Sequence, residues 1–207
     1  MKGNSYILYY AAVLGTVCAL LLTAAAKFTE PYRIANQEAE EMKNILVALK
    51  IPVPDGASPE QLVDVFEENV RDEYGDKAIY VYSPNDANGR VEAIALRFAG
   101  PGLWGPIKGF LALESDRRTI RGITFYEQEE TPGLGGDIVL PSFRARFEKK
   151  SIVDETGKPG IVIQVAGSRL PNGVDGITGA TMTCDKVQAM LNEVIQRLIE
   201  GNSKDGQ

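Results

Sequence analysis

The chain has 207 residues, 44% of them hydrophobic and 24% charged, which is enough for one sizeable hydrophobic core and excludes disordered, collagen-like and coiled-coil chains. Its 22 Lys and Arg against 28 Asp and Glu give a net charge of -6, so no nucleic-acid partner is expected. The absence of histidine excludes Ser-His-Asp and Cys-His catalysis, and His-ligated zinc or haem, from this chain.

Residues 6–26 form an uncharged apolar stretch between Lys2 and Lys27. As a helix it would span roughly 31 Å, which matches a membrane hydrocarbon core of about 30 Å. The alternative is a cleaved signal peptide, because Ala24–Ala26 resembles a cleavage site, but such apolar regions usually run only about 7 to 15 residues. We therefore expect an anchor over residues 1–26 and one domain over residues 27–207.

The orientation of this anchor is nearly balanced by charge, because lysines flank both of its ends. The short N-terminal tail favours an N-terminus inside and a body outside the cytoplasm. Cys18 would then lie in lipid and Cys184 in the outer domain, so no disulfide between them is expected.

Helical patterns follow the anchor. Apolar residues recur at helical spacing over residues 33–50, and this helix is expected to lead from the membrane into the fold. Ser58, Pro59 and Gln61 then supply an N-cap, a proline at the first helical position and a capping-box partner. A second helix is expected from there to about Arg71.

An alternating pattern typical of strands begins at Ala78. It covers residues 78–83, 91–98, 109–115, 119–127 and 160–167, which predicts an antiparallel sheet. A last helix is expected over residues 186–200, ended by Gly201, with a frayed tail after it. Helices, strands and a final helix in this order indicate an α+β fold with an antiparallel sheet flanked by helices.

The loop at residues 175–183, DGITGATMT, lies just ahead of that last helix. Its three hydroxyls and two glycines are suited to a simple helix cap or to a cradle for an anion, since free N–H groups and the helix dipole favour negative charge there. A cap needs only one hydroxyl.

Two further loops are rich in glycine and proline. Residues 129–136, EETPGLGG, are a turn or a close backbone approach to a flat ligand. Residues 100–106, GPGLWGP, carry the only tryptophan, which is either part of the core or the wall of a cofactor pocket.

These three loops together resemble a family of covalent FMN-binding subunits. TGAT at residues 178–181, preceded by Asp175, is similar to the site at which a flavin transferase attaches FMN through a phosphodiester. GLWGPIKGFLALE and ITFYEQEETPGLGGDI resemble the C subunit of the sodium-translocating NADH:quinone oxidoreductase and, less closely, the G subunit of the Rnf complex.

The resemblance implies one transmembrane helix, an extracytoplasmic domain with one covalent FMN, and a one-electron role beside other membrane subunits of an inner-membrane complex. It implies a flavin transferase as a maturation partner, membrane lipid around the anchor, and a domain on the periplasmic side. Carried over by position, the implied attachment point is Thr181, with Thr183 as the near alternative. The implied recognition and pocket residues are Asp175, Thr178, Gly179, Ala180, Glu130, Thr131, Leu103 and Trp104.

We therefore expect an electron-relay subunit with no turnover of its own. The alternatives are an Rnf-type subunit, and a membrane-anchored binding module in which TGAT is only a helix cap.

Overall fold

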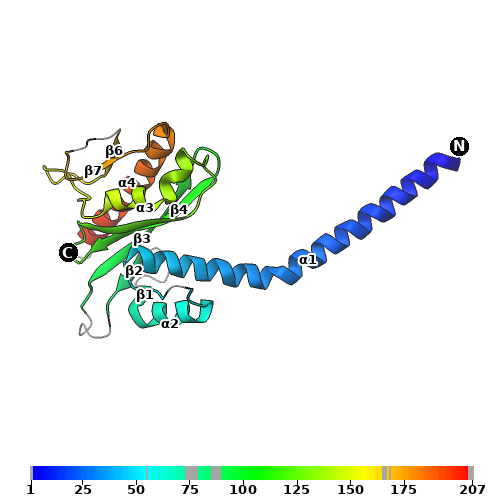
Figure 1. Cartoon of the computed structure of the whole chain (residues 1–207), viewed down its shortest axis with the longest axis horizontal. Helices are drawn as coiled ribbons and strands as arrows, with labels where there is room; N and C mark the ends of the chain where they lie inside the picture. The colour runs from blue at the N-terminus through cyan, green and yellow to red at the C-terminus, as the bar shows by residue number, and fades with distance from the viewer. Residues whose placement is uncertain are drawn as a thin grey trace. The chain divides into compact units, whose positions relative to one another are not determined.

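The computed structural model describes residues 2–54, 56–72, 79–84, 90–164, 167 and 169–204 (Figure 1). Contacts divide the chain into two compact units, residues 1–39 and 40–207. In chain order the elements are α1 (Lys2–Ala48), α2 (Pro59–Asn69), β1 (Val70–Asp72), β2 (Ile79–Tyr82), β3 (Ala93–Pro101), β4 (Pro106–Glu114), β5 (Ile120–Glu127), η1 (Gly135–Val139), α3 (Pro141–Arg144), η2 (Ala145–Phe147), β6 (Val162–Gln164), β7 (Gly173–Asp175) and α4 (Thr181–Lys204).

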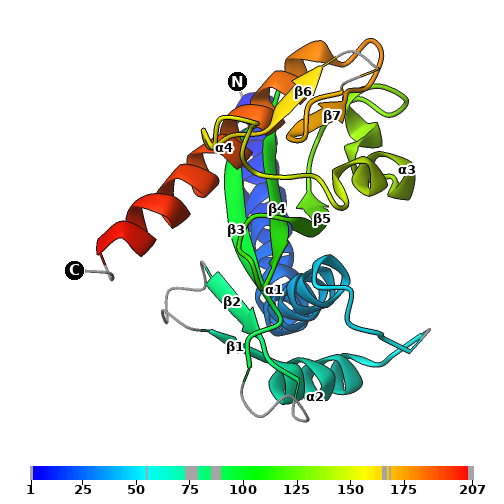
Figure 2. The same ribbon diagram turned by 90° about the vertical axis from the view of Figure 1, so that its left-hand side faces the viewer.

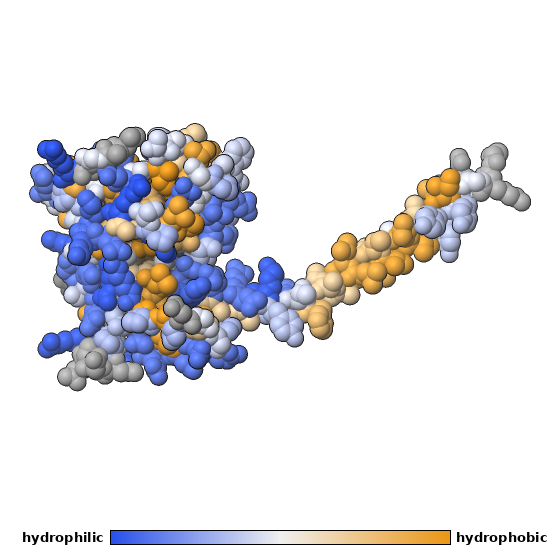
Figure 3. All heavy atoms as spheres, in the orientation of Figure 1, coloured by the Kyte–Doolittle hydropathy of each residue, from blue (hydrophilic) through white to orange (hydrophobic). Residues whose placement is uncertain are grey.

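Helix α1 is continuous from Lys2 to Ala48, although the sequence predicted separate helical segments before and after Pro31. A proline removes one N–H from the helix ladder, and the intact turns on both sides continue the helix past it. The proposed boundary at residue 26 lies inside α1. The surface of its N-terminal part is predominantly hydrophobic (Figure 3), and α1 is apolar and long enough to cross a membrane, judged by length and composition alone.

The second unit contains the antiparallel sheet that the sequence predicted. Its strands follow chain order, β1-β2-β3-β4-β5, and every neighbouring pair is antiparallel. The longest ladder joins β3 to β4, from the pair Ala93 and Glu114 to the pair Pro101 and Pro106. Residues 102–105 are therefore the tip of a hairpin, and this register places Trp104 at one end of the sheet.

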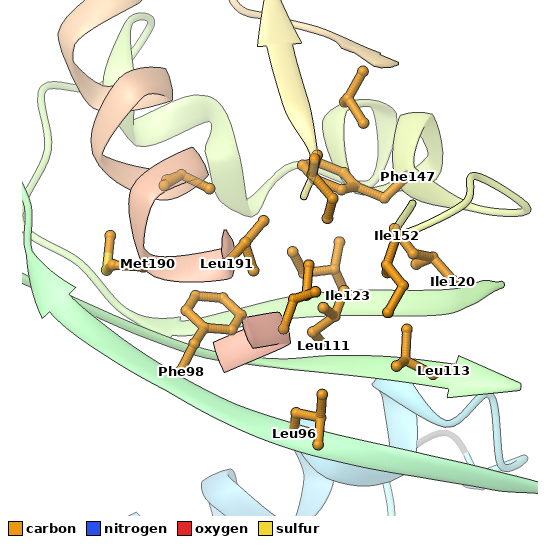
Figure 4. Packing of buried hydrophobic residues seen from close by; sticks show 14 of the residues in the cluster. Leu96, Phe98, Leu111, Leu113, Ile120, Ile123, Phe147, Ile152, Met190 and Leu191 are labelled. Carbon is orange, nitrogen blue, oxygen red and sulfur yellow. The ribbon is translucent and has the colours of Figure 1, made fainter. Parts of the chain in front are cut away.

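Both faces of the sheet are covered, α4 and α3 lying over one and α2 with the end of α1 over the other (Figures 1 and 2). On the first face Phe98 of β3 lies near Met190 and Leu191 of α4 (Figure 4). On the second face Phe110 of β4 belongs to a cluster with Leu46 of α1. Residues that alternate along β3 and β4 thus enter two different cores, which explains the period-two pattern.

Two glycines allow close approaches, Gly122 between α1 and the sheet and Gly109 between neighbouring strands. A Cβ on Gly122 would lie 2.5 Å from the Ala48 carbonyl oxygen, so the end of α1 rests directly on β5. A Cβ on Gly109 would overlap the Thr124 carbonyl oxygen, beside the Phe98 ring. Larger residues at either position would push the elements apart.

The strand predicted within residues 160–167 is present in part, as β6, but it does not pair with the antiparallel sheet as predicted. Strand β6 pairs in parallel with β7, in a separate two-stranded sheet, and Val165 and Ala166 lie outside the described residues. The physical reason is visible in α4: Gln188 accepts the Ile163 N–H at 2.7 Å, and Asn192 accepts the Ile161 N–H at 2.6 Å. These side chains occupy backbone groups that an antiparallel neighbour would need.

The predicted helix ends were partly wrong. The capping box at Ser58 is present, so the start of α2 is confirmed, but α2 ends at Asn69 because Val70 begins strand β1. Helix α4 begins at Thr181, inside the loop expected before it, and continues past Gly201 to Lys204. Ala78, where the first predicted strand begins, lies outside the described residues.

Candidate functional site

Glu130 lies where the three loops singled out in the sequence meet. It follows β5, is 5% exposed, and its carboxylate accepts hydrogen bonds from both other loops. Oε1 accepts the N–H groups of Leu103 at 2.6 Å and Trp104 at 3.2 Å, while Oε2 accepts the Thr183 hydroxyl at 2.5 Å. Segments far apart in the sequence therefore form one site.

The first loop is the tip of the β3–β4 hairpin. The Gly102 N–H donates to the Gly105 carbonyl at 2.7 Å, which closes the turn and leaves Leu103 and Trp104 projecting. Trp104 is 70% exposed, so it is not part of either core. A shallow hollow is lined by residues 99–106. Of the two interpretations of the tryptophan, the structure favours the wall of a surface site.

The second loop, after Glu130, is a compact turn that leads into η1. The Thr131 carbonyl accepts the N–H groups of Leu134 at 3.1 Å and Gly136 at 2.9 Å. Gly133 has φ +75°, a backbone conformation that favours glycine. Its N–H donates to the Asp137 carboxylate at 2.9 Å. Thr131 and Leu134 are exposed at the surface of this turn.

The third loop connects β7 to α4. Arg146 donates to the carbonyls of Asp175 at 3.1 Å and Gly176 at 2.7 Å, and the Asp175 carboxylate accepts the Gly167 N–H at 2.8 Å. Gly179 adopts φ +80°, and a Cβ there would lie 3.0 Å from the Leu134 side chain. The second and third loops are therefore in van der Waals range.

The three hydroxyls of this loop have different environments. Thr183 is 2% exposed and donates to Glu130, whereas Thr178 and Thr181 are exposed. Within the part of the chain that the structure describes, neither of these exposed hydroxyls makes a hydrogen bond. The residue before the first helical residue is Ala180, which has no side-chain acceptor, so the interpretation of TGAT as a simple helix cap is wrong.

Thr181 is the first residue of α4, a 24-residue helix. The first N–H groups of such a helix have no intrahelical partner, and together with the helix dipole they favour an anion at this end. The hydroxyl of Thr181 therefore lies where a phosphate group would be stabilised. Exposed apolar side chains of the three loops surround this end of the fold: Leu103, Trp104, Leu134 and Met182.

Cys184 contributes packing here. It is 4% exposed, its sulfur accepts the Ile177 N–H at 3.5 Å, and burial raises the pKa of the thiol. A thiol with a raised pKa is a poor nucleophile. The hydrogen bond from Ile177 to the Cys184 sulfur thus links the loop before α4 to the first turn of that helix.

Some residues that support the site were not identified as site residues from the sequence. Arg146 holds two carbonyls of the third loop, and Gln128 accepts the Glu130 N–H at 2.6 Å. Leu134 contacts the position of Gly179 from the second loop. Gln128 and Leu134 lie within the stretch ITFYEQEETPGLGGDI, but neither their contacts nor those of Arg146 could be predicted from it, because these contacts form only in the folded chain.

The arrangement fits a flat cofactor that ends in a phosphate. The phosphate would lie at the N-terminus of α4, and the exposed Leu103, Trp104 and Leu134 provide apolar surface for a planar ring. Residues 102–196 match the family model described as FMN-binding domain. The part of the chain from the β3–β4 turn to α4 is therefore similar to a flavin-binding domain, and it lies C-terminal to the long apolar helix.

Sequence relatives are more specific. The chain is 43% identical over 112 residues to the C subunit of the Na(+)-translocating NADH-quinone reductase of Vibrio vulnificus strain YJ016, covering 53% of this chain and 43% of the relative. It is 38% identical over 136 residues to the same protein of Neisseria meningitidis strain MC58, covering 64% of this chain and 53% of the relative. The chain thus spans about half the length of these relatives.

Solved structures share the fold. The crystal structure of the C subunit of the Na(+)-translocating NADH-quinone reductase from Parabacteroides distasonis superposes with a TM-score of 0.66 at 25% identity, covering 79% of this chain and 91% of that chain. NqrC of Shewanella oneidensis gives a TM-score of 0.62 at 24% identity, covering 76% and 91%. The resemblance to the C-subunit family, which the three loops predicted, is confirmed.

Proposed function

We propose that this chain is the FMN-carrying, electron-relay subunit of a Na(+)-translocating NADH-quinone reductase, with FMN joined through its phosphate to Thr181. The observation that carries the proposal is the exposed hydroxyl of Thr181, which makes no hydrogen bond to the described residues and lies at the first residue of α4, where the helix end favours a phosphate. The match to the FMN-binding domain and the relatives that are named as C subunits support it.

Each loop has a separate task in this proposal. FMN, when bound, supplies the electron-transfer chemistry. The N-terminus of α4 binds the phosphate, Gly179 and Ala180 shape the backbone before it, and Thr178 and Asp175 complete the motif that a flavin transferase recognises. Leu103, Trp104 and Thr131 are the residues proposed to border the ring.

The attachment step requires an activated donor. A flavin nucleotide with a phosphoanhydride at the FMN phosphorus, presented by the transferase, would exchange that bond for a new bond to Thr181 Oγ. The hydroxyl proton is released to water, the rest of the nucleotide leaves as a nucleoside monophosphate that keeps the anhydride oxygen, and no change of oxidation state occurs. Thr181 is suited to this step because its hydroxyl is accessible, whereas Thr183 is 2% exposed and bonded to Glu130.

Peptide mass spectrometry tests this assignment. The full chain, coexpressed with a flavin transferase and then digested, should yield an FMN adduct on the peptide that holds residues 178–183, and fragmentation should place it on Thr181. An adduct on Thr183, or none on a chain that is otherwise folded, would contradict the proposal. The chain without transferase is the control and should stay unmodified.

The proposed partners are the other membrane subunits of the complex, the flavin transferase and the lipid around α1. The alternative of an Rnf-type subunit predicts a different electron donor, ferredoxin in place of NADH. The relatives described above are named as the C subunit of the NADH-quinone reductase, which favours the sodium pump.

The proposed topology is a single crossing of the inner membrane, with the flavin domain on the periplasmic side. α1 is long and apolar enough for this crossing. Protease added to intact spheroplasts should therefore digest the domain, and a cytoplasmic marker should survive in the same sample. Digestion only after the membrane is permeabilised would place the domain inside the cell.

A further inference from the structure

Glu130 is a buried carboxylate whose two oxygens are held by donors from two other loops. Oε1 accepts the backbone N–H groups of Leu103 and Trp104, and Oε2 accepts the hydroxyl of Thr183. Hydrogen bonds to an ionised acceptor are strong, and a buried carboxylate without donors is costly. The position of this side chain is therefore coupled to both loops at once.

Two glycines make the close approach to this carboxylate sterically possible. A Cβ on Gly135 would overlap Thr183 Oγ1 and lie 2.7 Å from Glu130 Oε2. A Cβ on Gly102 would lie 2.5 Å from Glu130 Oε1. The sequence suggested that the glycines of residues 129–136 approach a flat ligand, whereas the structure places Gly135 against Glu130 and Thr183.

Thr183 stands two residues after Thr181 in the first turn of α4, so the backbone of the helix relates the two hydroxyls rigidly. One faces solvent and the other faces Glu130. The contact between Thr183 and Glu130 thus ties the helix end that carries Thr181 to the turn that carries Trp104.

We propose that Glu130 and Thr183 are positioning residues that hold the Trp104 turn in place relative to Thr181. Because Thr181 is the proposed attachment point, this inference rests on the proposed function. It assigns Glu130 a role through Leu103 and Trp104, in place of the direct contact with FMN that the family resemblance implied.

Hydrogen exchange in the full, unmodified chain tests the link without flavin. In Thr183→Val the carboxylate loses a donor, so the amides of Leu103 and Trp104 should exchange faster by about threefold. In Glu130→Ala both amides lose their acceptor and should exchange faster by about tenfold. Since Glu130→Ala could fail to fold, Thr183→Val is the deciding variant.

The matched control is Thr124→Val. Thr124 is also fully buried and its hydroxyl also donates one hydrogen bond, at 3.1 Å to the Asn44 carbonyl on the other face of the sheet. This variant should leave exchange at Leu103 and Trp104 unchanged. Equal acceleration in both valine variants would mean general loosening and would overturn the link.

Flavin fluorescence supplies the second measurement. Indole rings quench flavin emission at close range, and Trp104 is the only tryptophan. In FMN-loaded chain, Thr183→Val should raise the flavin emission at least twofold, and Thr183→Ser, which keeps the hydroxyl, should restore the low emission. Unchanged emission and unchanged exchange in Thr183→Val would overturn the inference.

The two proposals fail in different ways. If wild-type chain never acquires FMN, the proposed function fails, and the exchange experiment still decides whether Glu130 and Thr183 hold the turn. If Thr183→Val carries FMN in normal yield with both measurements unchanged, the proposed function stands and the link is wrong.

Discussion

Thr181→Ala should produce a folded chain that carries no covalent FMN and is colourless after coexpression with the flavin transferase. The groups lost are one methyl and a hydroxyl without a hydrogen bond in the described part of the chain, both on an exposed residue, and alanine is a good residue for a helix, so stability should change by less than about 0.5 kcal/mol. Absorbance of denatured protein near the flavin bands measures the covalent cofactor, and thermal unfolding measures stability.

Thr181→Ser is the matched control, because it keeps a hydroxyl at the same place and should retain at least part of the covalent FMN. Thr178→Ala should lower the yield of modification without removing the acceptor. Full modification of Thr181→Ala would show that another hydroxyl is the acceptor, and Thr183 would then have to leave Glu130 to be reached.

Loss of this flavin should abolish quinone reduction by the assembled complex and leave NADH oxidation by an artificial acceptor intact. The reason is that an electron relay lies between the site that oxidises NADH and the site that reduces quinone, so only the path through it is interrupted. Complexes assembled with Thr181→Ala and with wild-type chain differ only at this cofactor. Quinone reduction should fall to background in the first and persist in the second.

The isolated chain should cycle its flavin with chemical reductants and should not oxidise NADH. Purified full-length chain in detergent, loaded with FMN, should be reduced by dithionite and reoxidised, with negligible reduction by NADH. Its sequence contains no histidine, and its one G-x-G-x-x-G stretch, residues 100–105, turns from β3 into strand β4 and does not open the helix that a nicotinamide site requires. Rapid reduction by NADH would contradict the relay and would require a hydride-transfer site in this chain.

Much of the architecture was predictable because local patterns carry it. The apolar stretch before Lys27 is helical, the capping box at Ser58 starts α2, and alternating residues form the central strands of the sheet. Each of these features depends on residues within a few positions of one another. The three chemically unusual loops were also visible, because glycine, proline and threonine are concentrated in them.

The sequence could not reveal how β6 pairs or how α1 rests on the sheet. Strand β6 looks like the other strands in its alternation, but Gln188 and Asn192 of α4 occupy its backbone groups. In the sequence Gly122 is one glycine within a predicted strand, and nothing near it indicates that the Ala48 carbonyl of α1 packs against it. Both outcomes depend on contacts between segments distant in the chain.

The candidate site shows the same division. Local patterns predicted a threonine-rich motif before a long helix, a turn with a tryptophan and a turn rich in glycine. The exposure of Thr181, the burial of Thr183 and the link from Thr183 through Glu130 to Trp104 became visible only in the folded chain. The reason is that these bonds span 53 and 26 residues of sequence, so they follow from how the sheet and α4 pack and not from any local pattern.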